Sequence, residues 1–307
     1  MPTLASFSNI VTKRVRATIV DTTDTGRDKS WVEKALTLQP LYEGETDIPV
    51  DTTDFDFDFE DADYHLPFID WVVGKITLSP KRFGGKIFVR DNQIPQVSPV
   101  APIEYVTNKS TKTFYNKMSR ILAAGSTALT KLGFPSIVAG ATQASKTVTA
   151  DSPVALAKAA VAKLEESGLY EVTGILYDGS LSDFVDVGTS YHTAVLSYDA
   201  AGQAYLFGRW PVYEVPRGAL GGQKIAAIDK RFIVAGPSAN TKVTIDKGTS
   251  VERDGSGNIL EVRDAVEEDS TRIVPQFWFG YAVWGPKSGS TYTDFPAAVG
   301  TLGEVSP

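Results

Sequence analysis

The sequence predicts an α+β fold in which an extended acidic N-terminal segment precedes one long helix and a β-rich half. Three observations support this prediction. Phe and acidic residues alternate with period 2 near the N-terminus, apolar residues recur at helical spacing from Phe114, and short strand-like runs with turn signals follow Gly168. The 307 residues are enough for one large domain or two modest ones.

Composition excludes several classes of protein. The chain has no cysteine, which excludes disulfides, thiolate metal sites and a cysteine nucleophile. No apolar run approaches the roughly 20 residues that a membrane-spanning helix needs, so we expect no contact with a membrane. The first ten residues lack the pattern of a signal peptide. The net charge of −7 argues against a protein that coats nucleic acid through a basic surface.

The charge is distributed unevenly along the chain. Residues 1–74 contain 15 acidic and 6 basic side chains, a net charge of −9, whereas residues 75–307 contain 22 and 24, a net charge of +2. We therefore expect the acidic segment to dock on a weakly basic body, which can belong to a neighbouring copy of the chain.

The most acidic part of this segment is also striped with phenylalanine. The alternating residues are Asp54, Phe55, Asp56, Phe57, Asp58, Phe59 and Glu60. On an extended strand, period 2 places the three rings on one face and the carboxylates on the other. Two interpretations remain open: a solvated charged tail, or an arm whose Phe face is buried by another subunit. The aromatic content favours the arm, because solvated acidic tails contain few aromatic residues.

Two short strands are expected next, over residues 75–78 and 86–89, with residues 79–85 separating them. A helix from about residue 103 to 132 follows, since apolar or small residues recur at 114, 118, 121, 122, 125, 129 and 132. Pro102 suits its first turn, and Gly133 gives a stop signal. Residues 134–150 are rich in Gly, Ala, Ser and Thr and are expected to form a flexible crossing.

A second helix is signalled by Ser152 as N-cap, Pro153 at the first helical position and Gly168 at the C-terminal end. Strands are expected after it, at residues 171–177, 192–198, 204–207, 224–228, 242–245, 259–263 and 276–284. The turns at 199–202 and 254–258 are typical of hairpins. The last strand carries aromatic residues on both faces, which indicates either a strand covered on both sides in an assembly or an ordinary sandwich-core strand.

Residues that carry catalytic chemistry are scarce. The two histidines, His65 and His192, lack metal-ligand spacing, and the sequence contains no nucleophile elbow and no phosphate-binding loop. Asp254 opens a plain turn, because residues 254–265 lack the Gly and the acid that a calcium loop needs. A Ser-His-Asp triad stays open, since its members are distant in sequence. We predict no catalytic residue, no cofactor and no metal site, and therefore a protein that is not an enzyme.

Three stretches of the chain together resemble the major capsid proteins of tailed bacteriophages, which have the Hong Kong ninety-seven-type fold. Residues 76–89 look like the strand pair that leads into the family's spine helix. Residues 198–212 are similar to its "Asp, x, x, Gly, x, Tyr-Leu … Pro-Val" passage. Residues 226–235, followed by an aromatic strand that ends at Pro286, look like its "Gly-Asp-Phe" strand and closing strand. The chain departs from the pattern at Ile228, where the family has Gly before the Asp.

The resemblance implies a division into parts. It places an N-terminal arm at residues 1–40, an E-loop hairpin at 41–75, a peripheral domain with the long spine helix at 76–139 and 276–307, and a mixed α/β axial domain at 140–275. As candidates for the subunit interface it suggests the striped residues 54–60 together with Lys81 and Arg82.

The resemblance also implies a function. The chain would assemble in the host cytoplasm into hexamers and pentamers of an icosahedral virion shell that encloses double-stranded DNA without sequence specificity. Scaffold, portal and decoration proteins would be its partners. One alternative is a shell protein of an encapsulin-type nanocompartment. Another is a β-rich binding protein or enzyme.

Overall fold

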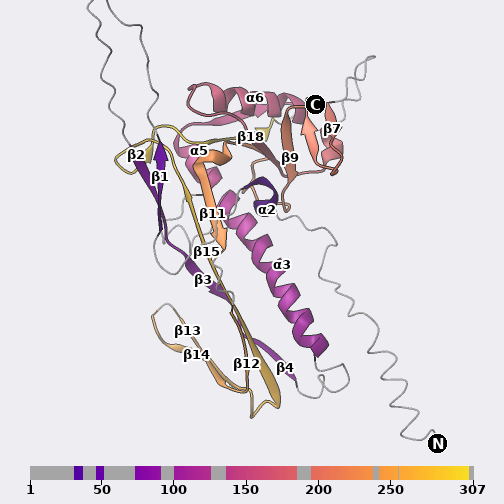
Figure 1. The fold of residues 1–307 in the computed structure, drawn as a ribbon, viewed down its shortest axis with the longest axis vertical. Helices are drawn as coiled ribbons and strands as arrows, with labels where there is room; N and C mark the ends of the chain where they lie inside the picture. Colours follow the sequence, from indigo (N-terminus) through magenta and orange to yellow (C-terminus); the bar gives the residue numbers. More distant parts are fainter. Residues whose placement is uncertain are drawn as a thin grey trace, which may run out of the picture.

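The computed structural model of the protein describes residues 31–36, 46–51, 73–90, 100–125, 136–184, 195–237, 242–254 and 256–303. Within them, two large sheets and one long helix meet around a shared apolar core (Figure 1). The predicted mixture of helix and sheet is therefore confirmed.

The first sheet is organised around one long strand, β15 (Ser270–Val283). Its partners in the described residues are β3 (Lys81–Gly84), β4 (Ile87–Arg90), β11 (Ile233–Pro237) and β12 (Lys242–Asp246). The registers place β3 and β4 along one edge of β15 and β11 and β12 along the other, all antiparallel. Its 14 residues extend roughly 45 Å at about 3.3 Å each, so it forms the axis of the sheet.

Helix α3 (Val100–Ala124) covers one face of this sheet. Phe114 stacks on Phe277 with ring centroids 4.6 Å apart and meets Phe279 edge-on at 5.9 Å. Along β15, the side chains of Phe277, Phe279 and Tyr281 are buried, whereas Trp278 on the opposite face is half-buried. The predicted alternation is confirmed, and within the described residues the face of Trp278 is less fully covered than the face of Phe277.

The second sheet has seven strands within the described residues. In order across the sheet they are β5 (Thr147–Ala150), β18 (Ala297–Leu302), β10 (Ile225–Ile228), β6 (Gly174–Tyr177), β9 (Trp210–Glu214), β8 (Ala204–Leu206) and β7 (Leu196–Tyr198). The β18/β5 and β6/β9 pairs are parallel and the other pairs are antiparallel. In β10, Ala226 and Ile228 join the core around α3, while Ile225 and Ala227 join a second core on the other face. The central strands are thus apolar throughout because both faces are covered.

Two helices cover the faces of this second sheet. The predicted helix α6 (Pro153–Glu165) is confirmed, with the Ser152 hydroxyl accepting a hydrogen bond from the Ala155 amide at 3.2 Å. On the other face, α5 (Ile137–Gln143) packs so closely that a Cβ on Gly140 would lie 2.2 Å from the Phe295 ring. Glycine at position 140 is therefore required by this close approach.

The remaining described elements are short. A single helical turn, α2 (Val32–Ala35), packs on α3, where the Trp31 indole donates to the Ser119 carbonyl at 3.2 Å. The other elements are the paired strands β1 (Thr46–Asp51) and β2 (Val73–Leu78), the pair β13 (Thr249–Arg253) and β14 (Ile259–Asp264), the pair β16 (Lys287–Ser288) and β17 (Thr291–Tyr292), and the 3-10 turns η2 (Leu181–Phe184) and η3 (Lys230–Phe232).

Three local predictions were wrong. The long helix ends at Ala124 rather than near residue 132, because Gly125 adopts a left-handed conformation (φ +80°) that stops it. In the expected crossing 134–150, residues 137–143 form α5 and 147–150 form β5. The supposed separator 79–85 contains β3, which is held in place by its pairing with β15.

The expected peripheral and axial domains stay a prediction. Strand pairing crosses their expected boundaries, because β18 lies beside β10 and β5, and β11 and β12 lie beside β15. Within the expected arm, Trp31, Val32, Ala35 and Leu36 are buried in the core around α3.

Replacing Phe114 with Ala removes the ring that joins α3 to β15. We expect the free energy of unfolding to fall by about 3–5 kcal/mol, the usual cost of truncating a buried Phe. Thr113→Ala, one position along at an exposed site, should change it by less than about 0.5 kcal/mol. Urea unfolding followed by circular dichroism measures both, and equal effects would contradict this packing.

Candidate functional site

The described part of the chain offers surfaces rather than a reaction centre. Within it, no group of three or more His, Asp or Glu side chains is placed to hold a metal ion, and no helix is long and apolar enough to cross a membrane. His65 and His192 lie outside the described residues. The candidates for function are therefore elements that project from the core or leave apolar surface exposed.

The first such element is the pair β1/β2. The Phe-striped residues 54–60 lie outside the described residues, but the strands that flank them pair in register from Thr46 with Leu78 to Asp51 with Val73. Asp47 accepts hydrogen bonds from Thr77 at 2.5 Å and from the Lys75 ammonium at 2.9 Å, and these bonds lower the pKa of its carboxyl. The base of a hairpin is thus fixed on both sides of the predicted stripe.

The other two predicted interface residues, Lys81 and Arg82, are on β3. Lys81 lies opposite Phe279 and Arg82 opposite Trp278 in the β3/β15 register. Because neighbouring residues on a strand point to opposite faces, Arg82 shares the face of Trp278, away from α3. Arg82 is exposed and Lys81 is half-buried. Their role at an interface stays a prediction.

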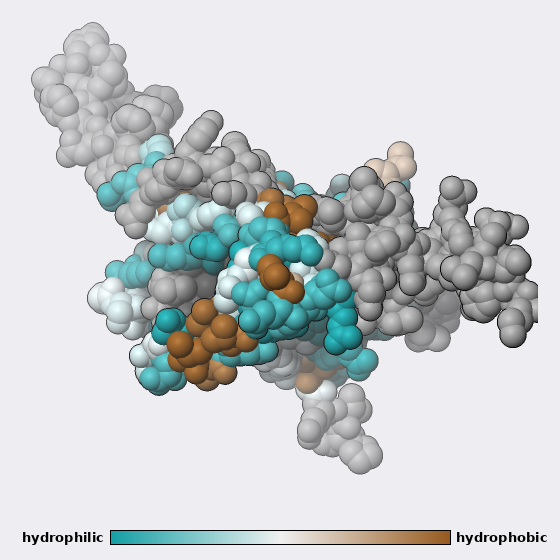
Figure 2. All heavy atoms as spheres, turned by 90° about the horizontal axis from the view of Figure 1, so that it is seen from below, coloured by the Kyte–Doolittle hydropathy of each residue, from teal (hydrophilic) through white to brown (hydrophobic). Residues whose placement is uncertain are grey.

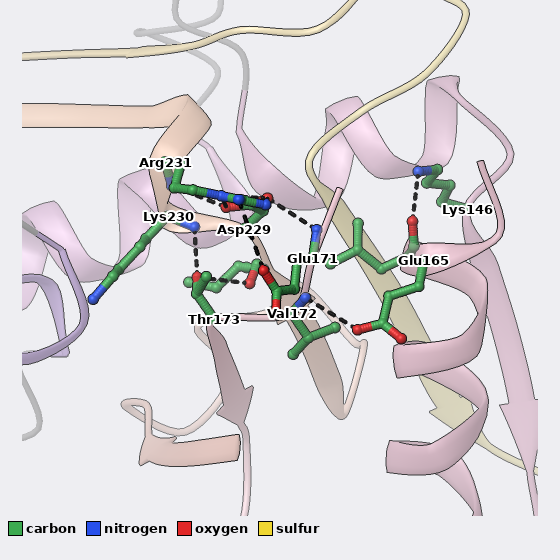
Figure 3. A network of polar contacts seen from close by, with 10 residues as sticks. Lys146, Glu165, Glu171, Val172, Thr173, Asp229, Lys230 and Arg231 are labelled. Carbon is green, nitrogen blue, oxygen red and sulfur yellow. Dashed lines mark hydrogen bonds and ion pairs between the residues drawn. The ribbon is translucent and has the colours of Figure 1, made fainter. Parts of the chain in front are cut away.

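A buried polar network stabilises the junction between β10 and η3 (Figure 3). The Asp229 side chain is fully buried and accepts hydrogen bonds from the Glu171 amide at 3.0 Å and the Arg231 amide at 3.1 Å. The Arg231 guanidinium donates to the same carboxylate at 2.6–2.9 Å, and this contact raises the pKa of Arg231. Asp229, in the stretch 226–235 that resembles the family's strand, therefore acts as a structural anchor.

A second buried charge, Lys146, stabilises the junction of α5, α6 and the residues before β18. Its ammonium forms an ion pair with Asp294, donates to the Leu164 carbonyl at 3.3 Å and lies 4.6 Å from the centre of the Tyr170 ring. The carbonyl belongs to the last turn of α6, where a cation is favoured by the helix dipole. Sequence reasoning missed Lys146, since a single lysine in a small-residue run gives no signal of burial.

The strands β13 and β14 form a two-stranded ribbon, residues 249–264, that extends from the end of the first sheet. Arg272 anchors its base: the guanidinium donates to Asp246 at 2.6 and 2.7 Å, to the Thr249 carbonyl at 2.6 Å and to the Ser250 hydroxyl at 2.9 Å. The hydrogen bonds from Arg272 and from the Gly248 amide lower the pKa of Asp246.

The ribbon carries exposed apolar side chains. Val251, Ile259, Leu260 and Val262 are all exposed, Leu260 by 62% and Val262 by 56%. Figure 2 looks at this end of the molecule and shows apolar side chains gathered on its surface between polar ones. The sequence predicted β14 and its turn but not the exposure of these residues. Exposed apolar patches of this kind mark interaction sites.

Solved structures resemble this fold along most or all of the chain. A protein of Mycobacterium phage Adephagia covers 100% of both chains with a TM-score of 0.68 and 16% identity. A protein of Gordonia phage Cozz covers 90% of this chain and 87% of its own, with a TM-score of 0.62 and 14% identity. A structure described as the capsid of an empty GTA particle covers 90% and 97%, with a TM-score of 0.54 and 12% identity.

No family model and no curated protein matches the sequence. At 12–16% identity, the structural matches show the fold: this chain has the fold of these phage and capsid structures. The resemblance to the tailed-phage capsid fold, expected from three short stretches, is thereby confirmed at the level of the fold.

Replacing Asp229 with Ala removes the buried carboxylate that accepts from the Glu171 and Arg231 amides and from the Arg231 guanidinium. We expect the free energy of unfolding to fall by about 2–5 kcal/mol, because each hydrogen bond to a charged group contributes about 1.5–3 kcal/mol. Asp229→Asn keeps one acceptor oxygen and should cost less. Glu171→Ala, which removes only an exposed ion pair with Arg231, should cost under about 1 kcal/mol. Thermal unfolding ranks the three variants, and any other order would contradict the anchor role.

The Arg272–Asp246 contact predicts a pH dependence of the ribbon. Because the pKa of Asp246 is lowered in the folded protein, the contact stabilises the ribbon above the ordinary Asp pKa of about 3.9 and is lost as the pH falls through the lowered value. Asp246→Asn should imitate the acid form at neutral pH. Amide exchange of residues 249–264, measured against an unstructured peptide of the same sequence, should show reduced protection in both cases.

Asp199→Asn, in the turn between β7 and β8, is the matched control and should leave the exchange of the ribbon unchanged. Full protection of the ribbon in Asp246→Asn would show that Arg272 does not hold it.

Proposed function

We propose that this chain is the major capsid protein of a tailed bacteriophage, the structural subunit of a shell that encloses double-stranded DNA. The observation that carries the proposal is a capsid-type fold over the whole chain, without a family match in sequence. The proposed role is structural rather than enzymatic.

The distribution of projecting elements supports this proposal. The β1/β2 pair and the β13/β14 ribbon lie toward opposite ends of the first sheet (Figure 1). An isolated two-stranded hairpin is marginally stable in water, so such elements gain stability when a neighbour covers them. A subunit of a closed shell needs contacts with several neighbours at once, and these are heterologous around each ring.

In the proposed shell, copies of the chain form hexamers and pentamers, residues 54–60 form part of the E-loop laid across a neighbour, and Lys81 and Arg82 lie at the subunit interface. Scaffold, portal and decoration proteins are the proposed partners, and the packaged DNA is contacted without sequence specificity. The proposed location is the virion, after assembly in the host cytoplasm.

The direct experiment is to express the chain, with and without the scaffold of its genome, and to examine it by light scattering and negative-stain microscopy. Rings or closed shells are expected, and a homogeneous monomer at high concentration under both conditions would overturn the proposal. Particles from infected cells should contain DNA and a portal. A cargo protein in their place would identify an encapsulin-type shell instead.

Replacing Phe55, Phe57 and Phe59 by Ser should leave the subunit folded and impair shell formation, because the proposed arm buries these rings against a neighbour. Circular dichroism reports folding and light scattering reports assembly. The matched control replaces the same residues by Leu, which keeps the stripe apolar and should keep assembly. Unfolding of the Ser variant would place the stripe in the core of its own subunit.

A further inference from the structure

The β13/β14 ribbon has its polar and apolar faces reversed relative to an ordinary surface hairpin. Residues that lie opposite each other on paired strands share a face. Ser250 lies opposite Arg263, and both make contacts with the sheet of their own subunit. Ser250 is buried against Arg272, and the Arg263 guanidinium lies 4.2 Å from the centre of the Phe88 ring. This polar face is therefore turned toward its own sheet. Val251 lies opposite Val262, and this apolar face is therefore turned toward solvent.

The ribbon is acidic, and the turn that follows it is more strongly so. Residues 249–269 contain seven acidic and two basic side chains, a net charge of −5. Glu252 lies directly opposite Glu261, an arrangement of like charges that destabilises a strand pair. The Glu261 carboxylate lies 3.9 Å from Arg263, whereas the Glu252 side chain makes no hydrogen bond or ion pair within the described residues. Both glutamates lie on the face of Ser250 and Arg263, because alternate residues of a strand share a face, so their charge flanks the apolar face rather than lying on it.

Residues 73–90 are the complement of the ribbon in charge. They contain five basic side chains and no acidic one, a net charge of +5. Three of the five interact with other groups of the subunit. Lys75 forms an ion pair with Asp47, and Lys86 donates a hydrogen bond to the Val251 carbonyl. Arg90 acts on Glu268, whose pKa is lowered first by the hydrogen bond from Arg263 and also by the charge of Arg90.

Lys81 and Arg82 are the two whose side chains make no hydrogen bond or ion pair in the described part of the chain. Arg82 shares a face of the sheet with Trp278, which is half-buried and lies on the side away from α3. This face therefore offers a cation beside a large apolar ring, the combination that the ribbon lacks.

We propose that the β13/β14 ribbon of one copy docks on the β3 region of a second copy, with its apolar face against Trp278 and Arg82 and with the acidic residues 249–269 close to the basic residues 73–90. The proposal rests on the proposed function, because it assumes that the chain assembles with itself. The opposite net charges of the two segments favour this pairing and disfavour contact between two ribbons, whose like charges repel.

The contact joins two different surfaces of the subunit, so it is heterologous. A heterologous contact repeats around a ring if the rotation between copies closes. The ribbon would then be a fixed interaction element of each ring, separate from the Phe-striped segment.

The absence of cysteine from the chain allows a direct test by cross-linking between copies. Two single variants, Arg82→Cys on a tagged chain and Glu252→Cys on an untagged chain, are co-assembled and treated with a short bismaleimide. Each chain carries one cysteine, so a dimer that contains one tagged and one untagged chain reports contact between different copies. The expected result is this mixed dimer as the main product. A Ser182→Cys chain, exposed on η2, replaces the Glu252→Cys chain in the control and should give none.

The second measurement concerns the apolar face. Val251→Thr with Val262→Thr keeps the β-branched shape of both side chains but removes apolar surface. It should raise the subunit concentration needed for assembly by about tenfold or more, equivalent to about 1.4 kcal/mol. Circular dichroism confirms that the variant is folded.

The outcomes separate the two proposals. If the unmodified chain does not assemble, the proposed function fails. If it assembles but the mixed dimer is absent and the Thr variant assembles at the normal concentration, the ribbon contact alone is overturned. A cross-link confined to tagged–tagged or untagged–untagged dimers would also overturn it, since it would show like segments meeting.

Discussion

The packing of α3 against β15 is the interaction on which the other elements depend. Phe114 meets Phe277 and Phe279 at the point where the helix crosses the strand, and the core that surrounds them extends without a break into the seven-stranded sheet. Burying a large apolar side chain contributes about 1.5–3 kcal/mol, and a favourable aromatic pair adds about 0.5–1.5 kcal/mol. Because four shorter strands pair with β15, the position of this one strand fixes the whole first sheet.

Within the described residues, one face of β15 joins the apolar core of the subunit. The opposite face, with Trp278 and Arg82, stays partly open, and the ribbon at the end of the sheet turns its valines outward. An independent monomer gains nothing from these features, which add apolar surface to water. In the proposed shell the same features would be contacts between copies. The polar networks at Asp229 and Arg272 stabilise the subunit near two different surfaces.

The parts of the fold that the sequence predicts well are those with local signals. The cap at Ser152 located α6, and strict alternation located β15. Strand β3 was missed because it is short, basic and defined only by its distant partner, and α5 was missed because Gly140 is there to fit a ring 155 positions further on. For the candidate site, the resemblance pointed to Lys81 and Arg82, whose role stays a prediction. A period-2 pattern is the same whichever face is exposed, so the outward turn of the ribbon could not be predicted from the sequence.

The central claim is that surfaces left open in the single subunit are covered by other copies of the same chain. A cryo-electron microscopy reconstruction of the assembled particles tests it most directly. The account predicts a closed shell whose subunit has this fold, with the outer face of the β13/β14 ribbon buried between copies. Particles in which the ribbon and the Trp278 face of the sheet both point into solvent, or in which the subunit has a different fold, would contradict it.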